Sequence, residues 1–275
     1  MVKNMKVAFI GAGNMAEAII SGLLKKEMSK PCDITVTNKQ DDERLTKLES
    51  MYGVVTSRKL DQVLQDADVV FLAMKPKDAK EAIQSISKYI TTKMLVVSVL
   101  AGISTTLIEG MLVTGARVIR TMPNTSASVG LSATAIAAGS NVEEKDVRTA
   151  THIFSSIGLC TTVEEEQIHA VTGLSGSGPA YFYYMVEALQ RAAVKEGLRP
   201  EVAKMLILQT LVGAAQMLSV SEKDAAQLRL EVTSPGGTTE AGIKVLEQYA
   251  TSLALEACLH SAAERSRELG AMLSE

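Results

Sequence analysis

The chain has 275 residues, enough for one large domain or for two of ordinary size. Hydrophobic residues make up 47% of it and charged residues 21%, a balance typical of soluble globular proteins. Lys and Arg number 28 against 31 Asp and Glu, and no basic block occurs, which argues against nucleic acid as a partner.

The cysteines and the apolar runs indicate the cellular compartment in which the protein is found. Cys32, Cys160 and Cys258 are widely spaced, without a CxxC motif or a histidine at ligand spacing. This favours a reducing cytoplasm and argues against disulfides and a metal site. The apolar stretch at residues 7–10 is too short for a signal peptide. The longest later run, 205–218, contains two Gln and is expected to be too short to span a bilayer and to be buried in protein, so we expect no membrane contact.

In the first part of the chain, short β-branched runs alternate with helical patterns. Strands are expected at 6–10, 34–37, 68–74, 94–100, 116–120, 131–139 and 159–164. Helices, apolar at i, i+3 and i+4, are expected at 14–27, 41–52, 60–67, 77–90, 104–112 and 142–156. Several strands are apolar throughout, as when helices cover both faces of a parallel sheet. The pattern predicts an α/β fold with a doubly wound sheet of Rossmann type.

From about residue 164 the pattern changes to helices alone. They are expected at 166–196 with a Gly-rich interruption, 200–220, 238–250 and 251–272. We therefore expect an NADP-binding domain at 1–163 and an all-helical domain at 164–275. The second part carries more apolar surface than a lone bundle could bury, which predicts a homodimer through the helical domain.

The first candidate site is the segment VAFIGAGNMAEAI, which begins at Val7. Gly11, Gly13 and Ala16 form a GxGxxA fingerprint between a strand and a helix. Gly11 permits the tight turn, Gly13 lets backbone approach a pyrophosphate, and Ala16 allows close packing of helix and strand. The amides at the start of the helix then face the pyrophosphate.

The end of the second strand discriminates between the cofactors. Enzymes that use NAD place an acidic residue there, whereas this strand ends in Thr37, Asn38 and Lys39. Asp41 and Asp42 come later and are expected to begin the next helix. Asn38 and Lys39 are suited to donate to a 2′-phosphate, which favours NADPH, with NADH as the alternative. Met74, Lys75 and Pro76 end the strand at 68–74, in the crevice where cofactors bind such sheets.

Several motifs in fixed order resemble one enzyme family. VAFIGAGNMAEAI, VVFLAMKP, VTGLSGSGPAY and SPGGTT are similar to segments of pyrroline-5-carboxylate reductase, the last enzyme of proline biosynthesis. The resemblance extends from residue 5 to about 270. It implies an NAD(P)H-dependent reduction of 1-pyrroline-5-carboxylate to L-proline by a Rossmann domain and an interlocking helical dimer domain. A larger ring of dimers, as in some relatives, is neither favoured nor excluded by the residues.

The resemblance also implies the site residues. Those implied to line the cofactor are Ile10, Gly11, Ala12, Gly13, Asn14, Met15, Asn38, Met74, Lys75 and Ala101. Backbone amides of Gly236, Gly237 and Thr238 are implied to hold the substrate carboxylate, and the Thr239 hydroxyl to meet the ring nitrogen as the catalytic contact. Glu165 matches a glutamate near proline, without an independent physical argument for it.

The SPGGTT stretch has a physical rationale of its own. Consecutive amides at a helix N-terminus hold a carboxylate without a charged side chain if glycine lets the backbone come close. The same composition is also typical of an ordinary helix cap. Two positions depart from the family pattern: Leu60 and Glu231 stand where members often have Asn, which weakens the case for tight NADPH binding.

Three alternatives remain. A hydroxyacid dehydrogenase would need a lysine base, and Lys195 and Lys204 lie beside a turn instead. A six-membered cyclic imino acid differs from the five-membered one by a methylene, worth only about 1–3 kcal/mol in a pocket. A nucleotide-binding regulator without activity would not need Thr239 or the Gly-Gly pair, both of which are present.

Overall fold

The computed structural model describes residues 5–274. The chain separates into two compact units. The first consists of the chain up to Pro179 together with the segment from His260 onward, and the second is Ala180–Leu259. The expected functional division at residue 163 stays a prediction. By compactness alone, the first turns of the helical part and the C-terminal segment belong with the sheet.

The described residues of the first unit form an eight-stranded sheet in the order β3-β2-β1-β4-β5-β6-β7-β8. The strands are β1 (Val7–Ile10), β2 (Ile34–Thr37), β3 (Val55–Thr56), β4 (Val69–Leu72), β5 (Leu95–Ser98), β6 (Arg117–Met122), β7 (Ser132–Ala138) and β8 (Gly158–Thr162). β1 to β6 are parallel, β7 pairs antiparallel with β6, and β8 pairs parallel with β7. The expected strands are confirmed. β3 was not expected, because two residues are too few to show an alternation.

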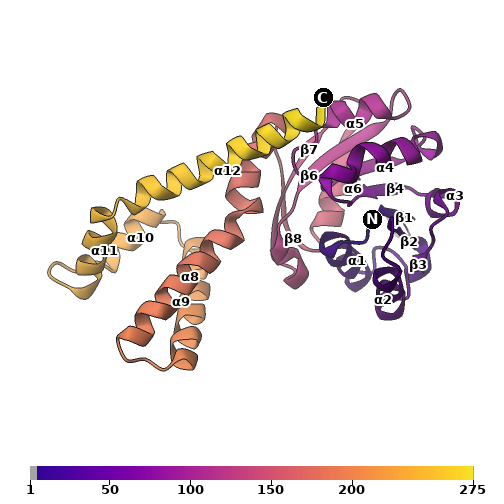
Figure 1. Cartoon of the computed structure of the whole chain (residues 1–275). Coiled ribbons are helices and arrows are strands. Elements are labelled where there is room, and N and C mark those ends of the chain that lie inside the picture. Colours follow the sequence, from indigo (N-terminus) through magenta and orange to yellow (C-terminus); the bar gives the residue numbers. More distant parts are fainter. Residues whose placement is uncertain (1–4, 275) are drawn as a thin grey trace. The chain divides into compact units, whose positions relative to one another are not determined.

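Helices cover both faces of the sheet, as the continuous apolar strands predicted (Figure 1). Val7 and Phe9 join the apolar cluster formed with α1 (Asn14–Lys25), α2 (Asp42–Tyr52) and α6 (Glu144–Phe154). Ala8 and Ile10 point the other way, into the cluster formed with α3 (Leu60–Leu64), α4 (Ala79–Ile86) and α5 (Thr105–Met111). Successive side chains of one strand therefore reach two separate cores, so neither face of the strand is polar.

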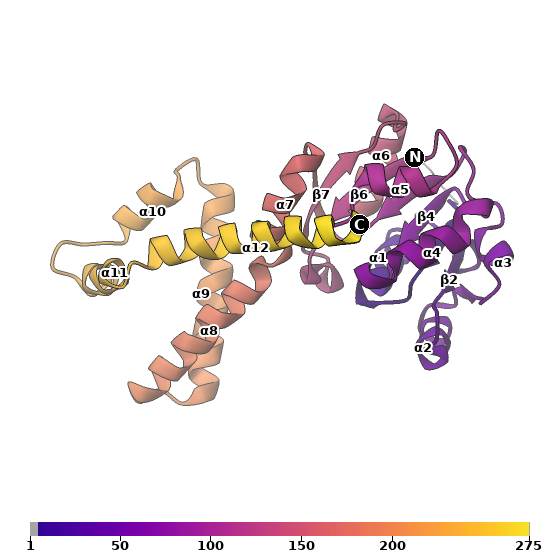
Figure 2. The same cartoon turned by 45° about the horizontal axis from the view of Figure 1, so that its top comes forward.

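The rest of the chain is helical. Its helices are α7 (Ile168–Val171), α8 (Gly178–Lys195), α9 (Pro200–Val220), α10 (Ala225–Glu231), α11 (Thr238–Gln248) and α12 (Thr251–Ser274). The Gly-rich interruption is a π-helical turn at Thr172–Gly176. A short connection joins α8 to α9, and α12 is one continuous helix (Figures 1 and 2). α10 was not expected, and Asp224 caps it by accepting from the Gln227 amide.

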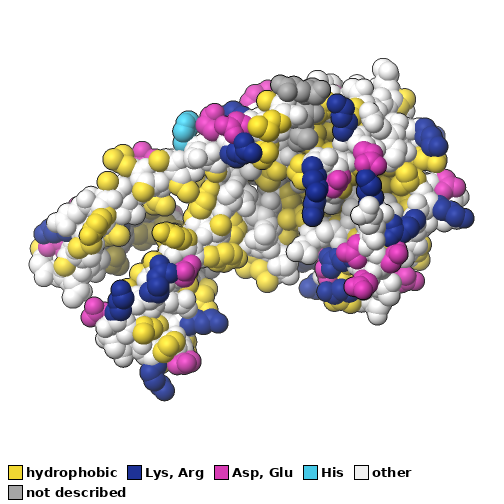
Figure 3. All heavy atoms as spheres, viewed as in Figure 1, with side chains coloured by type: hydrophobic (Ala, Val, Ile, Leu, Met, Phe, Trp, Pro, Cys, Tyr) yellow, Lys and Arg dark blue, Asp and Glu magenta, His cyan; other side chains and the backbone are white. Residues whose placement is uncertain are grey.

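The helices of the second unit expose apolar side chains along their lengths (Figure 3). In α9 only Ala203 is buried, whereas Met205, Val212 and Leu218 are all more than half exposed. The prediction that residues 205–218 are buried is therefore wrong for the single chain, which leaves most of this helix exposed. The helix is also longer than the run and, by length and composition, could cross a membrane.

Candidate active site

Gly11 is required by the fold itself. It follows β1 with φ at +113°, a backbone conformation that disfavours side chains. Its amide donates to the Thr37 carbonyl at 2.9 Å, at the end of β2. A Cβ placed on Gly11 would lie 2.4 Å from the Ala73 backbone, just beyond β4. Glycine here lets the connections after β1 and β4 come together.

Gly13 is a glycine that the protein's own packing does not require. It is the N-cap of α1, with an extended backbone that any residue adopts, and it is exposed. The nearest atom to a Cβ built there is the Ala73 carbonyl oxygen at 3.8 Å, an ordinary contact. Gly13 offers no side chain to cap the first amides of α1. The open space and the uncapped amides leave room for a pyrophosphate, whose contact with this turn stays a prediction.

Arg44, from α2, braces this Gly-rich turn. Its Nε donates to the Ala12 carbonyl at 2.6 Å, and its Nη2 pairs with Glu17 of α1 at 2.5 Å. The Tyr52 hydroxyl donates to the same carboxylate at 3.1 Å. Burial alone would raise the pKa of Glu17, but the hydrogen bond and charge of Arg44, helped by Tyr52, lower it. The role of Arg44 was not predicted from the sequence, because an arginine in the first turn of a helix is a common surface feature.

At the end of β2, the two predicted phosphate ligands already have partners. The Asn38 amide group donates to the Asp41 carbonyl at 2.7 Å and accepts from the Asp41 amide at 2.9 Å. Lys39 pairs with Glu81 of α4 at 2.6 Å. Asp41 caps α2, which confirms that Asp41 and Asp42 begin the helix. The side chain of Asn38 therefore shapes the turn, and the cation of Lys39 must change partners to meet a phosphate.

The remaining cofactor candidates follow β4 and β5. Lys75 is exposed, while Met74 packs partly against the apolar cluster of α3 to α5. Pro76 starts a 3-10 turn directly behind them. Ala101 lies in the turn after β5, next to Gly102, whose carbonyl oxygen would be 2.5 Å from a Cβ at Gly270 of α12. Because β2, β1, β4 and β5 are adjacent and parallel, all these candidates gather at one edge of the sheet.

Glu165 has a structural role that the sequence did not suggest. Its carboxylate accepts from the Thr105 amide at 2.8 Å, from the Thr105 hydroxyl, and from Arg120 at 3.2 Å. Arg120 is 1% exposed, and burial lowers its pKa while Glu165 opposes the shift. Its Nε and Nη2 have no hydrogen-bond partner. Glu165 thus neutralises a buried cation, and its contact with substrate stays a prediction.

The SPGGTT stretch forms a tight turn into α11. Gly236 has φ at +71°, and Gly237 is the N-cap, without a side chain to cap the helix. The Gly237 amide donates to the Ser234 carbonyl at 2.9 Å. The Gly236 amide donates to the carboxylate of Glu240 at 2.8 Å, so two of the three predicted amides already have partners within the chain. Thr238 and Thr239 are the first two helical residues, and both are exposed.

The two departures from the family pattern have local explanations. Leu60, the first residue of α3, packs against the same apolar cluster as Met74. Glu231 pairs with Lys223 at 2.5 Å. The carboxylate of Glu231 is therefore partly neutralised by a neighbour within its own unit.

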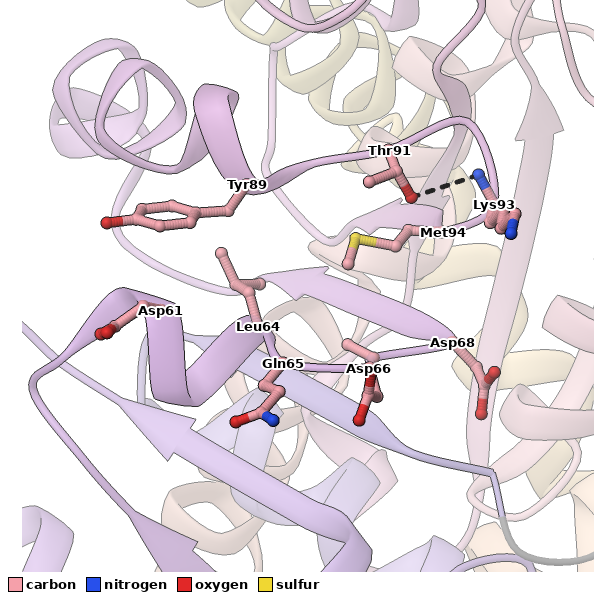
Figure 4. Close-up of a pocket in the computed structure, with 10 residues that line it drawn as sticks. Asp61, Leu64, Gln65, Asp66, Asp68, Tyr89, Thr91, Lys93 and Met94 are labelled. Atoms are coloured by element: carbon pink, nitrogen blue, oxygen red, sulfur yellow. Dashed lines mark hydrogen bonds between the residues drawn. The ribbon is translucent and has the colours of Figure 1, made fainter.

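A pocket of about 450 Å³ lies elsewhere (Figure 4). Asp61, Leu64 and Tyr89 line it, together with Asp68 and Met94, which precede β4 and β5. It is at the amino ends of the strands, whereas the cofactor candidates follow the carboxyl ends. Among residues 5–274, no group of three or more His, Cys, Asp or Glu is arranged to hold a metal ion.

The sheet order and the Gly-rich turn define a dinucleotide-binding protein of Rossmann type. Residues 6–102 match the family described as NADP oxidoreductase, coenzyme F420-dependent, which places the chain among the NAD(P)-linked oxidoreductases. Residues 165–269 match the family of pyrroline-5-carboxylate reductase dimerisation domains. The chain belongs to the pyrroline-5-carboxylate reductase family, as its motifs predicted.

Relatives from distant organisms are similar over nearly their full lengths. The chain is 45% identical to pyrroline-5-carboxylate reductase 2 of Bacillus subtilis, covering 96% of this chain and 95% of the relative. Among solved structures, the Coxiella burnetii pyrroline-5-carboxylate reductase has a TM-score of 0.89 at 40% identity, covering 97% and 99% of the chains. The Plasmodium falciparum pyrroline carboxylate reductase, solved with NADP bound, has a TM-score of 0.88 at 27% identity, covering 98% and 100%.

Proposed function

We propose that this protein reduces 1-pyrroline-5-carboxylate to L-proline with NADPH. The observation that carries the substrate assignment is the turn into α11, where Gly236 adopts a positive φ and the glycine N-cap leaves the first helical amides without a side-chain cap. Amides in this arrangement attract a carboxylate without a cationic side chain. A small anionic imino acid, whose ring is otherwise apolar, suits such a site.

In the proposed reaction, the bound reduced nicotinamide would supply a hydride to the imine carbon, C2 of the pyrroline ring, and the ring nitrogen carries a proton. A protonated imine forms readily near neutral pH, so the chain needs no strong acid. The residues at the start of α11 hold the carboxylate, and the Thr239 hydroxyl orients the ring nitrogen. Rate enhancement then comes mainly from proximity and orientation.

A spectrophotometric assay tests the function directly. Purified protein with 1-pyrroline-5-carboxylate and NADPH should consume the absorbance of the reduced nicotinamide and produce proline. NADH and the six-membered analogue run in parallel, and we expect a lower KM for NADPH and a preference for the five-membered ring. No turnover of either ring with either cofactor would instead favour the nucleotide-binding regulator.

Replacing Thr239 by Val is expected to lower kcat/KM about ten- to hundredfold, equivalent to roughly 1–3 kcal/mol of lost hydrogen bonding. Valine keeps the β-branched shape and the backbone amide, so only the hydroxyl is lost. Steady-state kinetics measure the effect, and NADPH affinity should hardly change.

Thr238→Ala is the matched control for Thr239→Val. Both residues are exposed in the first turn of α11, and only the amide of Thr238 is assigned a role. Loss of the Thr238 side chain should leave kcat/KM within a fewfold of the value for the unmodified protein. Normal turnover in the Thr239 variant, or greater damage in the Thr238 variant, would show that the role belongs to the wrong threonine.

We further propose that the apolar face of the second unit is covered by a second copy of the chain. The exposed residues of α9 lie within the segment that matches the dimerisation family. Apolar surface of this extent on neighbouring helices is typical of an obligate interface. A bilayer is the competing partner for α9, because its length and composition also permit a membrane span.

Light scattering is expected to find a dimer or a larger assembly at micromolar concentration, without detergent. Val212→Glu, on the exposed face of α9, should dissociate or unfold it, since a buried unpaired carboxylate is costly. Val129→Glu is the control: Val129 is 72% exposed, in the first unit and outside the dimerisation segment. A folded monomer of the unmodified chain would refute the assembly.

We also propose a cytoplasmic location. Cys32, Cys160 and Cys258 are free thiols. Burial raises the pKa of the Cys160 thiol to about 11, so it remains protonated and unreactive. This pattern suits a reducing compartment.

A further inference from the structure

An arginine distant from the fingerprint reaches the end of β2. Arg58 lies between β3 and α3, and its Nη1 donates to the carbonyls of Lys39 at 2.5 Å and Asn38 at 3.2 Å. Its Nε and Nη2 donate to Asp42 at 2.9 and 2.5 Å. The guanidinium therefore lies against the backbone directly after β2, and its side chain is 40% exposed.

A second cation, Lys39, also lies at the end of β2 and forms an ion pair with a residue of α4. Lys39 follows β2, and its partner Glu81 is in α4, which follows β4. In the sheet, β1 lies between β2 and β4. The ion pair thus links the connections on either side of the Gly-rich turn. The hydrogen bond to Glu81, and the charge of Glu81, raise the pKa of Lys39.

In Rossmann folds the ribose 2′ position lies at the end of the second strand, and arginine accommodates a phosphate there. We infer that Arg58 and Lys39 together bind the 2′-phosphate of NADPH. Until the phosphate binds, Asp42 is the ionic partner of Arg58 and Glu81 is that of Lys39. The inference rests on the proposed use of NADPH. It assigns the main role to Arg58, because the Asn38 side chain is already committed to Asp41 and Arg44 to Ala12 and Glu17.

The exchange of partners is energetically reasonable. The side chains of Asp42 and Glu81 are 82% and 71% exposed, and exposed ion pairs contribute little. A phosphate monoester carries about −1.5 to −2 charges at neutral pH and accepts several hydrogen bonds from a planar guanidinium. The phosphate therefore competes well with single carboxylates.

Calorimetric titration with 2′,5′-ADP and with 5′-AMP tests this site without catalysis. Arg58→Gln should weaken 2′,5′-ADP binding roughly ten- to hundredfold, as loss of charge-assisted hydrogen bonds does, and leave 5′-AMP binding within about twofold. Glu81→Gln should strengthen 2′,5′-ADP binding about two- to fivefold by releasing Lys39 and removing a like charge. Arg58→Lys should fall between Arg58→Gln and the unmodified protein, because it keeps the charge and loses the planar fork.

Arg148→Gln is the matched control, an exposed arginine in α6 paired with Glu144, and it should change neither affinity. Unchanged 2′,5′-ADP binding in Arg58→Gln would overturn the role of Arg58, and unchanged or weaker binding in Glu81→Gln would overturn the exchange. Both results leave the proposed reductase activity standing. Equal binding of 2′,5′-ADP and 5′-AMP to the unmodified protein would overturn this inference together with the NADPH preference, whereas the reductase assay with NADH would still report the reaction.

Discussion

A Gly13→Asp variant is expected to remain folded and to lose at least roughly a hundredfold in NADPH affinity, since placing like charges together costs several kcal/mol. Asp is among the best N-cap residues, and the space around Gly13 admits a side chain without a clash in the protein. The same carboxylate would lie in front of the amides that are proposed to face the pyrophosphate. Thermal melting should show an unchanged or raised Tm, while fluorescence titration with NADPH shows the loss.

Gly11→Ala is the contrasting variant, because it tests the fold instead of the ligand. Its methyl group would meet the Ala73 backbone at 2.4 Å, at a φ of +113°. Overpacking and a strained backbone each cost about 1–3 kcal/mol, so we expect a loss of about 3–5 kcal/mol in the free energy of unfolding. If Gly13→Asp bound NADPH within threefold of the unmodified protein, the pyrophosphate would not lie at this helix start.

The second large effect is expected at Glu165. Removing its carboxylate by Glu165→Ala leaves Arg120 charged and buried without its partner, which typically costs about 3–5 kcal/mol of stability. It also frees Thr105 at the first turn of α5, four residues after Ala101. Urea unfolding measures the loss.

Two further variants separate the structural role from substrate binding. Glu166→Ala, an exposed neighbour, should leave stability within about 0.5 kcal/mol. A double variant, Glu165→Gln with Arg120→Met, removes the buried charge together with its partner and should recover most of the stability. If Glu165→Ala instead kept full stability and only raised the KM for the imino acid, the substrate contact implied by the family resemblance would be the correct role.

The parts of the fold that could be predicted from the sequence are those with a local repeating pattern of side chains. The strand-and-helix alternation of the first unit was predictable, because side chains of 4- to 7-residue strands and longer helices repeat with their own periods. β3 was missed because two residues are too few to show an alternation, and α10 was missed although α5, of the same length, was found. The 205–218 run was expected to be buried, since an apolar run shows that a surface needs covering but not whether the same chain covers it.

The sequence by itself determined the family and the glycine positions, because a positive φ or a close backbone approach leaves few other residues acceptable, as at Gly11 and Gly236. Only the tertiary structure decided the ionic partners. Arg44 and Glu17 are 27 residues apart, and Arg120 and Glu165 are 45 apart. An ion pair has no periodicity, and each cation in the sequence has many carboxylates within reach of an unfolded chain. Which of them it meets depends on how the sheet orders its strands. Arg44 meets Glu17 because β1 and β2 are neighbours, whereas Glu165, which follows β8, meets Arg120 of β6.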